Sequence, residues 1–306
     1  MPSTMPTTMN NIDDNNNNDE SVFQGKKGIC TTLREEGKKG SYIENLPKVQ
    51  AVNPYWMYSW GAKPADGVPS PPSYPTDGPR RIPPGDNNGS SSDINIDFFP
   101  MLWGYYGNQI EQSLEEIRIQ NQRVIFGFNE PDKAKQANIS VETAINAWPQ
   151  LESVAVENDR KTLLISPSCA NPLGPWFEAF MTQVDTMELR VDAIGVHHYG
   201  GTNFPAFCEK MTTIYEKYNY RPLVLTEFAV ADWQATALKA NQHTPNKVLE
   251  FMEQALEWME QPEQYWILGY AWFSFDINNQ HGTSSALFNN NGGLTPLGRF
   301  YSSFKQ

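Results

Sequence analysis

The chain has 306 residues, of which 39% are hydrophobic, and its formal net charge is −12 at pH 7. It can bury one large core, and an acidic balance without a lysine or arginine cluster argues against a nucleic-acid partner and suits a neutral substrate. There is no apolar run of about 18 residues to span a membrane, and the three cysteines, Cys30, Cys169 and Cys208, form neither a CxxC pair nor a disulfide framework.

Residues 1–24 are polar and rich in asparagine, and we expect this segment to be disordered. It lacks the apolar stretch of a signal peptide. Either a signal was removed ahead of it, or the protein is not secreted by that route.

From residue 25 onward, strand-like and helix-like segments alternate, as in βα units with a parallel sheet. Eight segments are predicted as strands, namely 28–30, 49–53, 98–103, 124–128, 163–166, 193–197, 223–227 and 268–273. Helical patterns fall between or after most of them. Eight strands that alternate with helices predict a single α/β domain over residues 25–306, a (β/α)8 TIM barrel.

The segment 61–93, after the second predicted strand, is dominated by proline, glycine and serine. A loop of this length inside a compact domain is usually functional or disordered. We interpret it as the rim of a substrate groove, and a flexible insertion is an equal alternative for its end, residues 85–93.

Aromatic residues cluster just beyond the second and third predicted strands. Residues 53–61 (NPYWMYSWG) hold four aromatic rings, including Trp56 and Trp60, and Trp103 opens a second cluster. Flat apolar faces at one end of a barrel suit the binding of sugar rings. For any single ring, a hydrophobic plug beneath the long loop is an equal alternative.

Two predicted strands each deliver a glutamate where the apolar run ends, Glu130 after residues 124–128 and Glu227 after residues 223–226. At the carboxyl ends of barrel strands the two would face each other, which is the arrangement that glycoside hydrolysis needs. A separation of about 5–5.5 Å would predict retention of anomeric configuration. Asn129 can donate its amide to a sugar 2-hydroxyl. A solvated loop residue, a helix cap or a salt bridge is the alternative for either glutamate alone.

The sixth predicted strand ends in two histidines and a tyrosine. Because side chains alternate along a strand, His197 and Tyr199 should share one face while His198 points the other way. His197 is expected to hold the glutamates in place or to bind a sugar hydroxyl, and Tyr199 is expected to bind substrate beside it. Since no HxH, HExxH or Cys/His cluster occurs, no metal site is predicted. Trp272, at the end of the last strand, is predicted to form the floor of the subsite next to the scissile bond.

The ordered motifs FGFNEPD, ISPSCA, DAIGVHHYG, LVLTEFA and YAWFSF, spread over about residues 26–304, resemble glycoside hydrolase family 128. That family comprises clan A retaining endo-β-1,3-glucanases with an alkali-sensitive-linkage-type catalytic domain. The resemblance implies that Glu130 is the acid/base and Glu227 the nucleophile of a double displacement on laminarin-type β-1,3-glucan. This reaction requires no cofactor.

Two other functions stay open from the sequence. One is a different clan A β-glycanase, such as a mannanase or xylanase, and the other is a catalytically silent β-glucan-binding barrel. The intact glutamate pair argues against the second. We expect a monomer without a membrane partner, in an extracellular or cell-wall location, although no signal peptide is visible.

Overall fold

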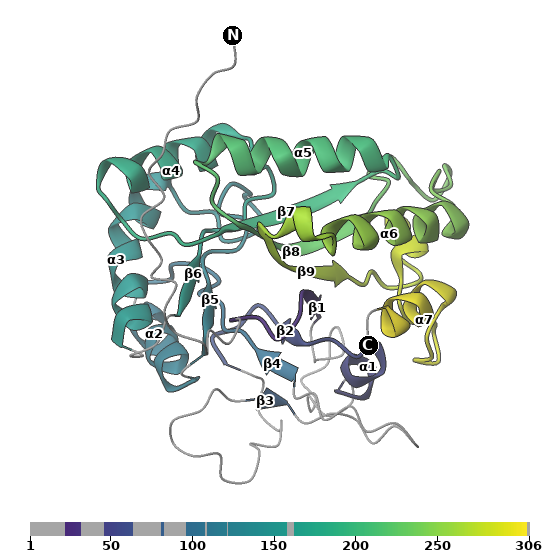
Figure 1. Cartoon of the computed structure of the whole chain (residues 1–306), viewed down its shortest axis with the longest axis horizontal. Coiled ribbons are helices and arrows are strands. Elements are labelled where there is room, and N and C mark those ends of the chain that lie inside the picture. Colours follow the sequence, from purple (N-terminus) through teal and green to yellow (C-terminus); the bar gives the residue numbers. More distant parts are fainter. Residues whose placement is uncertain are drawn as a thin grey trace.

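The computed structural model describes residues 22–31, 46–63, 81–82, 96–107, 109–120, 122–157 and 162–304. Most of the predicted N-terminal disordered segment and most of the predicted loop 61–93 therefore lie outside the described residues. The described chain alternates strands with helices in an α/β fold (Figure 1). None of the helices in these ranges is both long enough and apolar enough to cross a membrane.

The described ranges hold nine strands, and all but the two-residue β3 run parallel to their neighbours. They are β1 (Lys27–Cys30), β2 (Trp56–Tyr58), β3 (Arg81–Ile82), β4 (Ile96–Phe98), β5 (Val124–Phe126), β6 (Leu163–Ile165), β7 (Ile194–Gly200), β8 (Leu223–Val230) and β9 (Ile267–Phe273). Seven form one sheet in the order β3-β4-β2-β1-β9-β8-β7, and β5 pairs with β6. Single parallel bridges, Met101 to Phe126 and Ile165 to Ala193, join this pair to the larger sheet.

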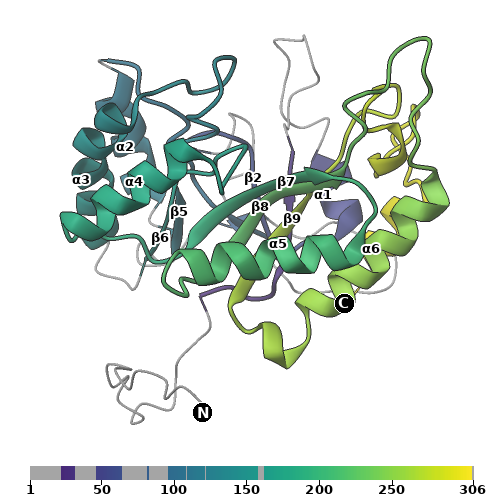
Figure 2. The same ribbon diagram turned by 90° about the horizontal axis from the view of Figure 1, so that it is seen from above.

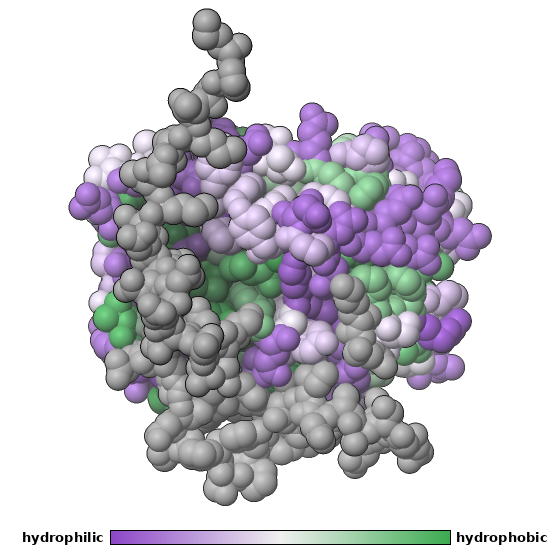
Figure 3. All heavy atoms as spheres, viewed as in Figure 1, coloured by the Kyte–Doolittle hydropathy of each residue, from purple (hydrophilic) through white to green (hydrophobic). Residues whose placement is uncertain are grey.

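The helices lie outside the strands, with α2, α3 and α4 beside β5 and β6, and α5 and α6 beside β7, β8 and β9 (Figure 1; Figure 2). They are α1 (Leu46–Val52), α2 (Gln109–Gln120), α3 (Val141–Glu157), α4 (Pro175–Thr186), α5 (Phe204–Lys217), α6 (Pro245–Met259) and α7 (Pro296–Ser303), with 3-10 turns η2 (Pro262–Gln264) and η3 (Thr283–Ser285). Three of them begin at an Asn or Thr whose side chain accepts a backbone N–H, with a proline one or two residues later, which fixes where each helix starts. The outer surface over α6 is mostly hydrophilic (Figure 3).

Side chains on the two faces of the strands form two separate cores. The inner core contains Cys30, Trp56, Tyr58 and Phe126, and the larger outer core fills the space between strands and helices. Successive residues of one strand thus serve different cores, and only those on the inner face approach the open carboxyl ends of the strands.

The second predicted strand, residues 49–53, is wrong. These residues belong mainly to helix α1, and the strand is Trp56–Tyr58. Val49 and Val52 are both fully buried and stand three residues apart, which is the spacing of one helix face rather than of a strand face. Because the true strand begins later, Trp56 lies inside it and not beyond its end.

Two consecutive lysines fasten β1 to the last helices. The Lys27 ammonium donates to the carbonyls of Tyr301, Ser302 and Phe304, and Lys26 donates to Met259 O and Gln264 O. Burial lowers the pKa of Lys27 to about 8, against the opposing effect of the Glu260 charge. Both lysines supply donors to carbonyls that the helix ends leave without an intrahelical partner.

Candidate active site

Glu130 stands one turn beyond β5 in a backbone conformation that glutamate rarely adopts. Its φ is 39°, in the left-handed region, and its N–H donates to Ser168 O at 2.8 Å. The Asp132 carboxylate accepts from the N–H groups of Ala170 and Asn171, which ties this turn to the segment after β6. A strained backbone held by such contacts is typical of functional positions.

A β-bulge in β8 turns Glu227 toward the inner face. Between paired positions, β7 advances from Gly195 to His197 while β8 advances from Val224 to Glu227, so β8 carries one extra residue. Val224 faces the inner core, and strict alternation from it would send Glu227 toward the helices. The bulge instead points Glu227 inward and Phe228 outward, which is a known use of bulges beside active sites.

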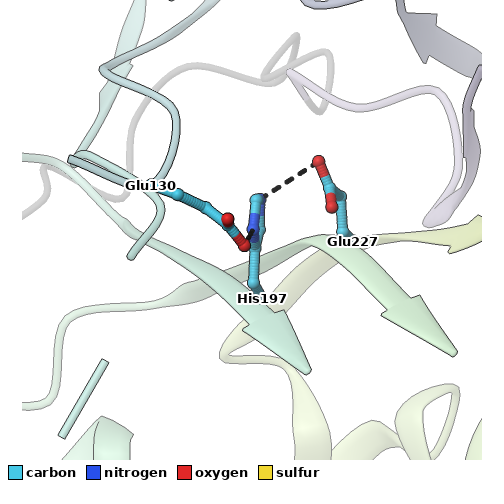
Figure 4. A group of neighbouring side chains, drawn as sticks. All are labelled: Glu130, His197 and Glu227. Atoms are coloured by element: carbon cyan, nitrogen blue, oxygen red, sulfur yellow. Dashed lines mark hydrogen bonds and ion pairs between the residues drawn. The ribbon is translucent and has the colours of Figure 1, made fainter. Parts of the chain in front are cut away.

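His197 lies between the two glutamates (Figure 4). Its Nδ1 is 3.0 Å from Glu130 Oε1, and its Nε2 is 3.4 Å from Glu227 Oε1, which is an ion-pair separation rather than a hydrogen bond. Burial of the ring disfavours its charged form, but the Glu227 charge and the Glu130 hydrogen bond outweigh burial, so the pKa of His197 is raised above 6.5. The ring thus contacts both carboxylates and holds them in one site.

The Glu227 carboxylate is surrounded by hydrogen-bond donors. Tyr58 OH (3.0 Å) and Trp60 Nε1 (2.7 Å) donate to Oε1, and Tyr199 OH donates to Oε2. Burial and the Glu227 charge raise the pKa of both tyrosines well above 10, so their hydroxyls keep the protons that they donate. These donors fix the carboxylate in one orientation.

A pocket of about 200 Å³ opens next to Trp60, which donates to Glu227, and neither glutamate lines it. Trp60 and Trp103 are among its lining residues, and the ring of Trp103 is stacked on Tyr106 with centroids 5.7 Å apart. The same Trp60 side chain therefore contacts both Glu227 and the pocket. Of the predicted substrate-binding rings, Trp60, Trp103 and Tyr199 are partly exposed.

The structure contradicts the predicted sugar contacts of Trp56 and Trp272. Trp56 is 1% exposed and stacks on Phe99 in the inner core, below the site. Trp272 is 0% exposed, and it faces outward, where its ring packs against Phe228 at 4.9 Å. Both rings are core residues, because neither leaves surface on which a sugar could lie.

The predicted alternation around His197 is confirmed. His197 and Tyr199 point into the site, whereas His198 packs against Phe207 of α5 and its Nδ1 lies 3.4 Å from Lys210 Nζ. Asn129 is 3% exposed, and its amide nitrogen lies 3.3 Å from Gln136 Oε1 while its oxygen lacks a hydrogen-bond partner. Its contact with a sugar hydroxyl stays a prediction.

Sequence reasoning missed two site residues. Tyr58 reaches Glu227 from β2, and Phe273 packs edge-on against both Tyr199 (5.4 Å) and Trp60 (6.0 Å). Placing the second strand at Trp56–Tyr58 would have found Tyr58 at its carboxyl end. Phe273 could have been found from strand alternation, because it and Trp272 lie on opposite faces of β9.

Among the described residues, Glu130, His197 and Glu227 are near enough to hold a metal ion, with one ligand atom of each within 4.8 Å of the others. In this structure, however, the three partner one another, and both Glu227 oxygens already accept hydrogen bonds. The same distance means that an oxygen of Glu130 lies within 4.8 Å of an oxygen of Glu227. The geometry thus presents two carboxylates across a short gap.

Several known proteins are similar to this chain. A family 128 (subgroup I) endo-β-1,3-glucanase from Amycolatopsis mediterranei in complex with laminaritriose is 24% identical with a TM-score of 0.66, and the match covers 91% of this chain and 99% of that chain. A subgroup II endo-β-1,3-glucanase from Sorangium cellulosum is 26% identical with a TM-score of 0.64 (92% and 99% covered). A subgroup VII oligosaccharide-binding protein from Trichoderma gamsii is 20% identical with a TM-score of 0.61 (92% and 95%). No curated protein sequence matches.

The family described as glycosyl hydrolase catalytic core matches residues 43–301, a span that includes Glu130, His197 and Glu227. This match and the similar structures confirm the resemblance to glycoside hydrolase family 128 that the sequence motifs predicted. The chain belongs to the glycosyl hydrolase catalytic core family.

Proposed function

We propose that the protein is a retaining endo-β-1,3-glucanase whose parallel strands form a (β/α)8 barrel. The observation that carries this proposal is the short gap between Glu130 and Glu227, with oxygens within 4.8 Å of each other. Retaining glycosidases hold their carboxyl groups about 5–5.5 Å apart, whereas inverting enzymes need about 6.5–9.5 Å to fit a water. The laminaritriose complex of a similar structure supports the choice of β-1,3-glucan.

In the first step, the Glu227 carboxylate attacks the anomeric carbon while Glu130 donates a proton to the leaving oxygen. The glycosidic bond breaks, and a covalent glycosyl-enzyme forms at Glu227. In the second step, Glu130 takes a proton from water as the water attacks the same carbon, which releases Glu227. Two inversions give net retention.

The surrounding residues serve this chemistry in distinct ways. Tyr58, Trp60 and Tyr199 donate to Glu227 and hold it in position for attack. His197 contacts both glutamates, so it keeps acid/base and nucleophile in register through both steps. Trp103 lies in the adjoining pocket, where we place a substrate ring against its face.

The test is a screen of laminarin, mixed-linkage glucan, mannan and xylan with product analysis. We expect release of laminari-oligosaccharides from laminarin and little from mannan or xylan. Glu130→Gln and Glu227→Gln should each reduce the rate by more than about a hundredfold, while the exposed Glu263→Gln serves as a matched control. Preferred cleavage of mannan or xylan would overturn the substrate, and binding of laminarin without any products would point to an oligosaccharide-binding protein.

Proton NMR of the first product tests the mechanism. A retaining enzyme releases the β-anomer before mutarotation. If the α-anomer came first, Glu227 would not be the nucleophile.

A further inference from the structure

A large aromatic side chain is exposed to solvent beside the proposed catalytic centre. Trp233 follows β8 directly and is 59% exposed, and its ring lies 5.9 Å from the ring of Tyr199 at an interplanar angle of 71°. The Tyr199 hydroxyl in turn donates to Glu227. One aromatic ring therefore separates Trp233 from the proposed nucleophile.

The position of Trp233 is fixed by its neighbours. The indole contacts the rings of Phe275 (6.3 Å) and His281 (5.5 Å), which both come from the segment after β9. The preceding residue, Asp232, is buried, and its carboxylate accepts from the N–H groups of Gln234 and Gln242. A ring braced in this way loses little conformational freedom when a ligand covers it.

Two aromatic side chains, Trp60 and Tyr199, contact different oxygens of the Glu227 carboxylate. Trp60, which lines the pocket, donates to Glu227 Oε1, whereas Tyr199, which contacts Trp233, donates to Glu227 Oε2. A glucan chain bound along these rings at Glu227 would therefore extend from Trp60 past Tyr199 to Trp233. This continuity identifies the occupant of the exposed face as a further sugar ring of the same chain.

We propose that the exposed face of Trp233 binds a pyranose ring of β-1,3-glucan next to the reacting sugar, and so sets the chain length that the enzyme prefers. The inference rests on the proposed substrate, but not on turnover. A flat indole matches the apolar face of a pyranose ring, and the ring beside it, Tyr199, links this contact to the nucleophile.

The test measures binding of laminarihexaose to the Glu130→Gln protein by calorimetry, with and without a second substitution. Trp233→Ala should weaken binding about 10-fold, the equivalent of about 1.4 kcal/mol, and Trp233→Phe should restore part of the loss because it keeps an aromatic face. Tyr265→Ala is the matched control, since Tyr265 is 70% exposed and precedes β9 at the opposite end of the strands. Laminaribiose should show a smaller difference than laminarihexaose.

Intrinsic fluorescence supplies a second readout. Laminarihexaose should shift tryptophan emission to shorter wavelength, and Trp233→Phe should reduce this shift. Equal affinity of the Trp233→Ala and Tyr265→Ala proteins would overturn the inference alone. Failure of every protein to bind laminarihexaose would overturn both the inference and the proposed substrate.

Discussion

The buried His198 makes the stability of the protein sensitive to acid. Its side chain is 8% exposed in total and packs on Phe207, so burial, aided by the charge of Lys210, lowers its pKa from 6.5 to about 3. Because the unfolded chain binds a proton near pH 6.5 and the folded chain does not, the stabilisation from this group is complete above pH 6.5 and is lost as pH falls toward 3. The sign is therefore a loss of stability in acid.

The magnitude follows from these two values. The pKa of His198 falls from 6.5 to about 3 on folding. Since each pKa unit corresponds to about 1.4 kcal/mol, the full effect on the free energy of unfolding is about 5 kcal/mol. Below pH 6.5, the free energy of unfolding should thus fall by up to about 1.4 kcal/mol for each pH unit through His198 alone. His198→Phe removes this dependence and keeps a ring against Phe207.

The assay is urea unfolding followed by tryptophan fluorescence at pH 7, 6, 5 and 4. At neutral pH the free energies of unfolding of wild type and His198→Phe differ by a constant. Between pH 6 and pH 4 the free energy of unfolding of the variant should rise relative to that of wild type by about 2–3 kcal/mol. Other titrating groups, including His197, are common to both proteins and cancel. The half-buried His243 replaced by Phe should show a smaller effect. Parallel pH profiles for wild type and His198→Phe would mean that folding does not change the pKa of His198.

Three further predictions concern backbone strain, the misplaced tryptophans and the capping lysine. Glu130→Gly should be about 1 kcal/mol more stable than Glu130→Ala in urea unfolding, because glycine adopts the left-handed φ of 39° freely, and equal stabilities would show that this conformation carries no strain. Trp56→Ala and Trp272→Ala should each lose about 3–5 kcal/mol of stability, while the folded variants bind laminarihexaose as wild type does; weaker binding without loss of stability would reverse our assignment of these rings to the core. Lys27→Met should lower the free energy of unfolding by about 1–3 kcal/mol, since it leaves buried carbonyls without a donor, and a neutral result would mean that water replaces the ammonium.

The sequence located the proposed catalytic residues better than the proposed binding surface. An apolar run that ends in one acidic residue predicts a carboxylate at the carboxyl end of a strand whatever its neighbours are, so Glu130 and Glu227 were found. Alternation also placed His197 and Tyr199 together, because that argument needs only the local strand. Such predictions use short segments, and the structure keeps those segments as strands.

The errors arose where the face that a side chain occupies depends on the residue at which the strand begins. A shift of a few residues in the second strand moved Trp56 from the core to the predicted surface and hid Tyr58. The bulge in β8 is equally invisible in the sequence, because the extra residue is defined by the pairing of β8 with β7 and β9. Trp233 was overlooked because its value as a ligand contact comes from neighbours distant in sequence, such as Phe275.

The capping of the last helix by Lys27 has a consequence for the order of folding in the cell. Its three carbonyl partners lie 274 to 277 residues further along the chain, so at about 5–20 residues per second they are synthesised roughly 15–55 s after β1. Until β9 has been synthesised, shortly before these carbonyls, β1 also lacks its partner on one side, and it is an unpaired edge with a lysine that no helix yet covers. The seam between the first and last strands therefore closes only as synthesis ends, and this is the interval in which the nascent chain has most need of protection from aggregation.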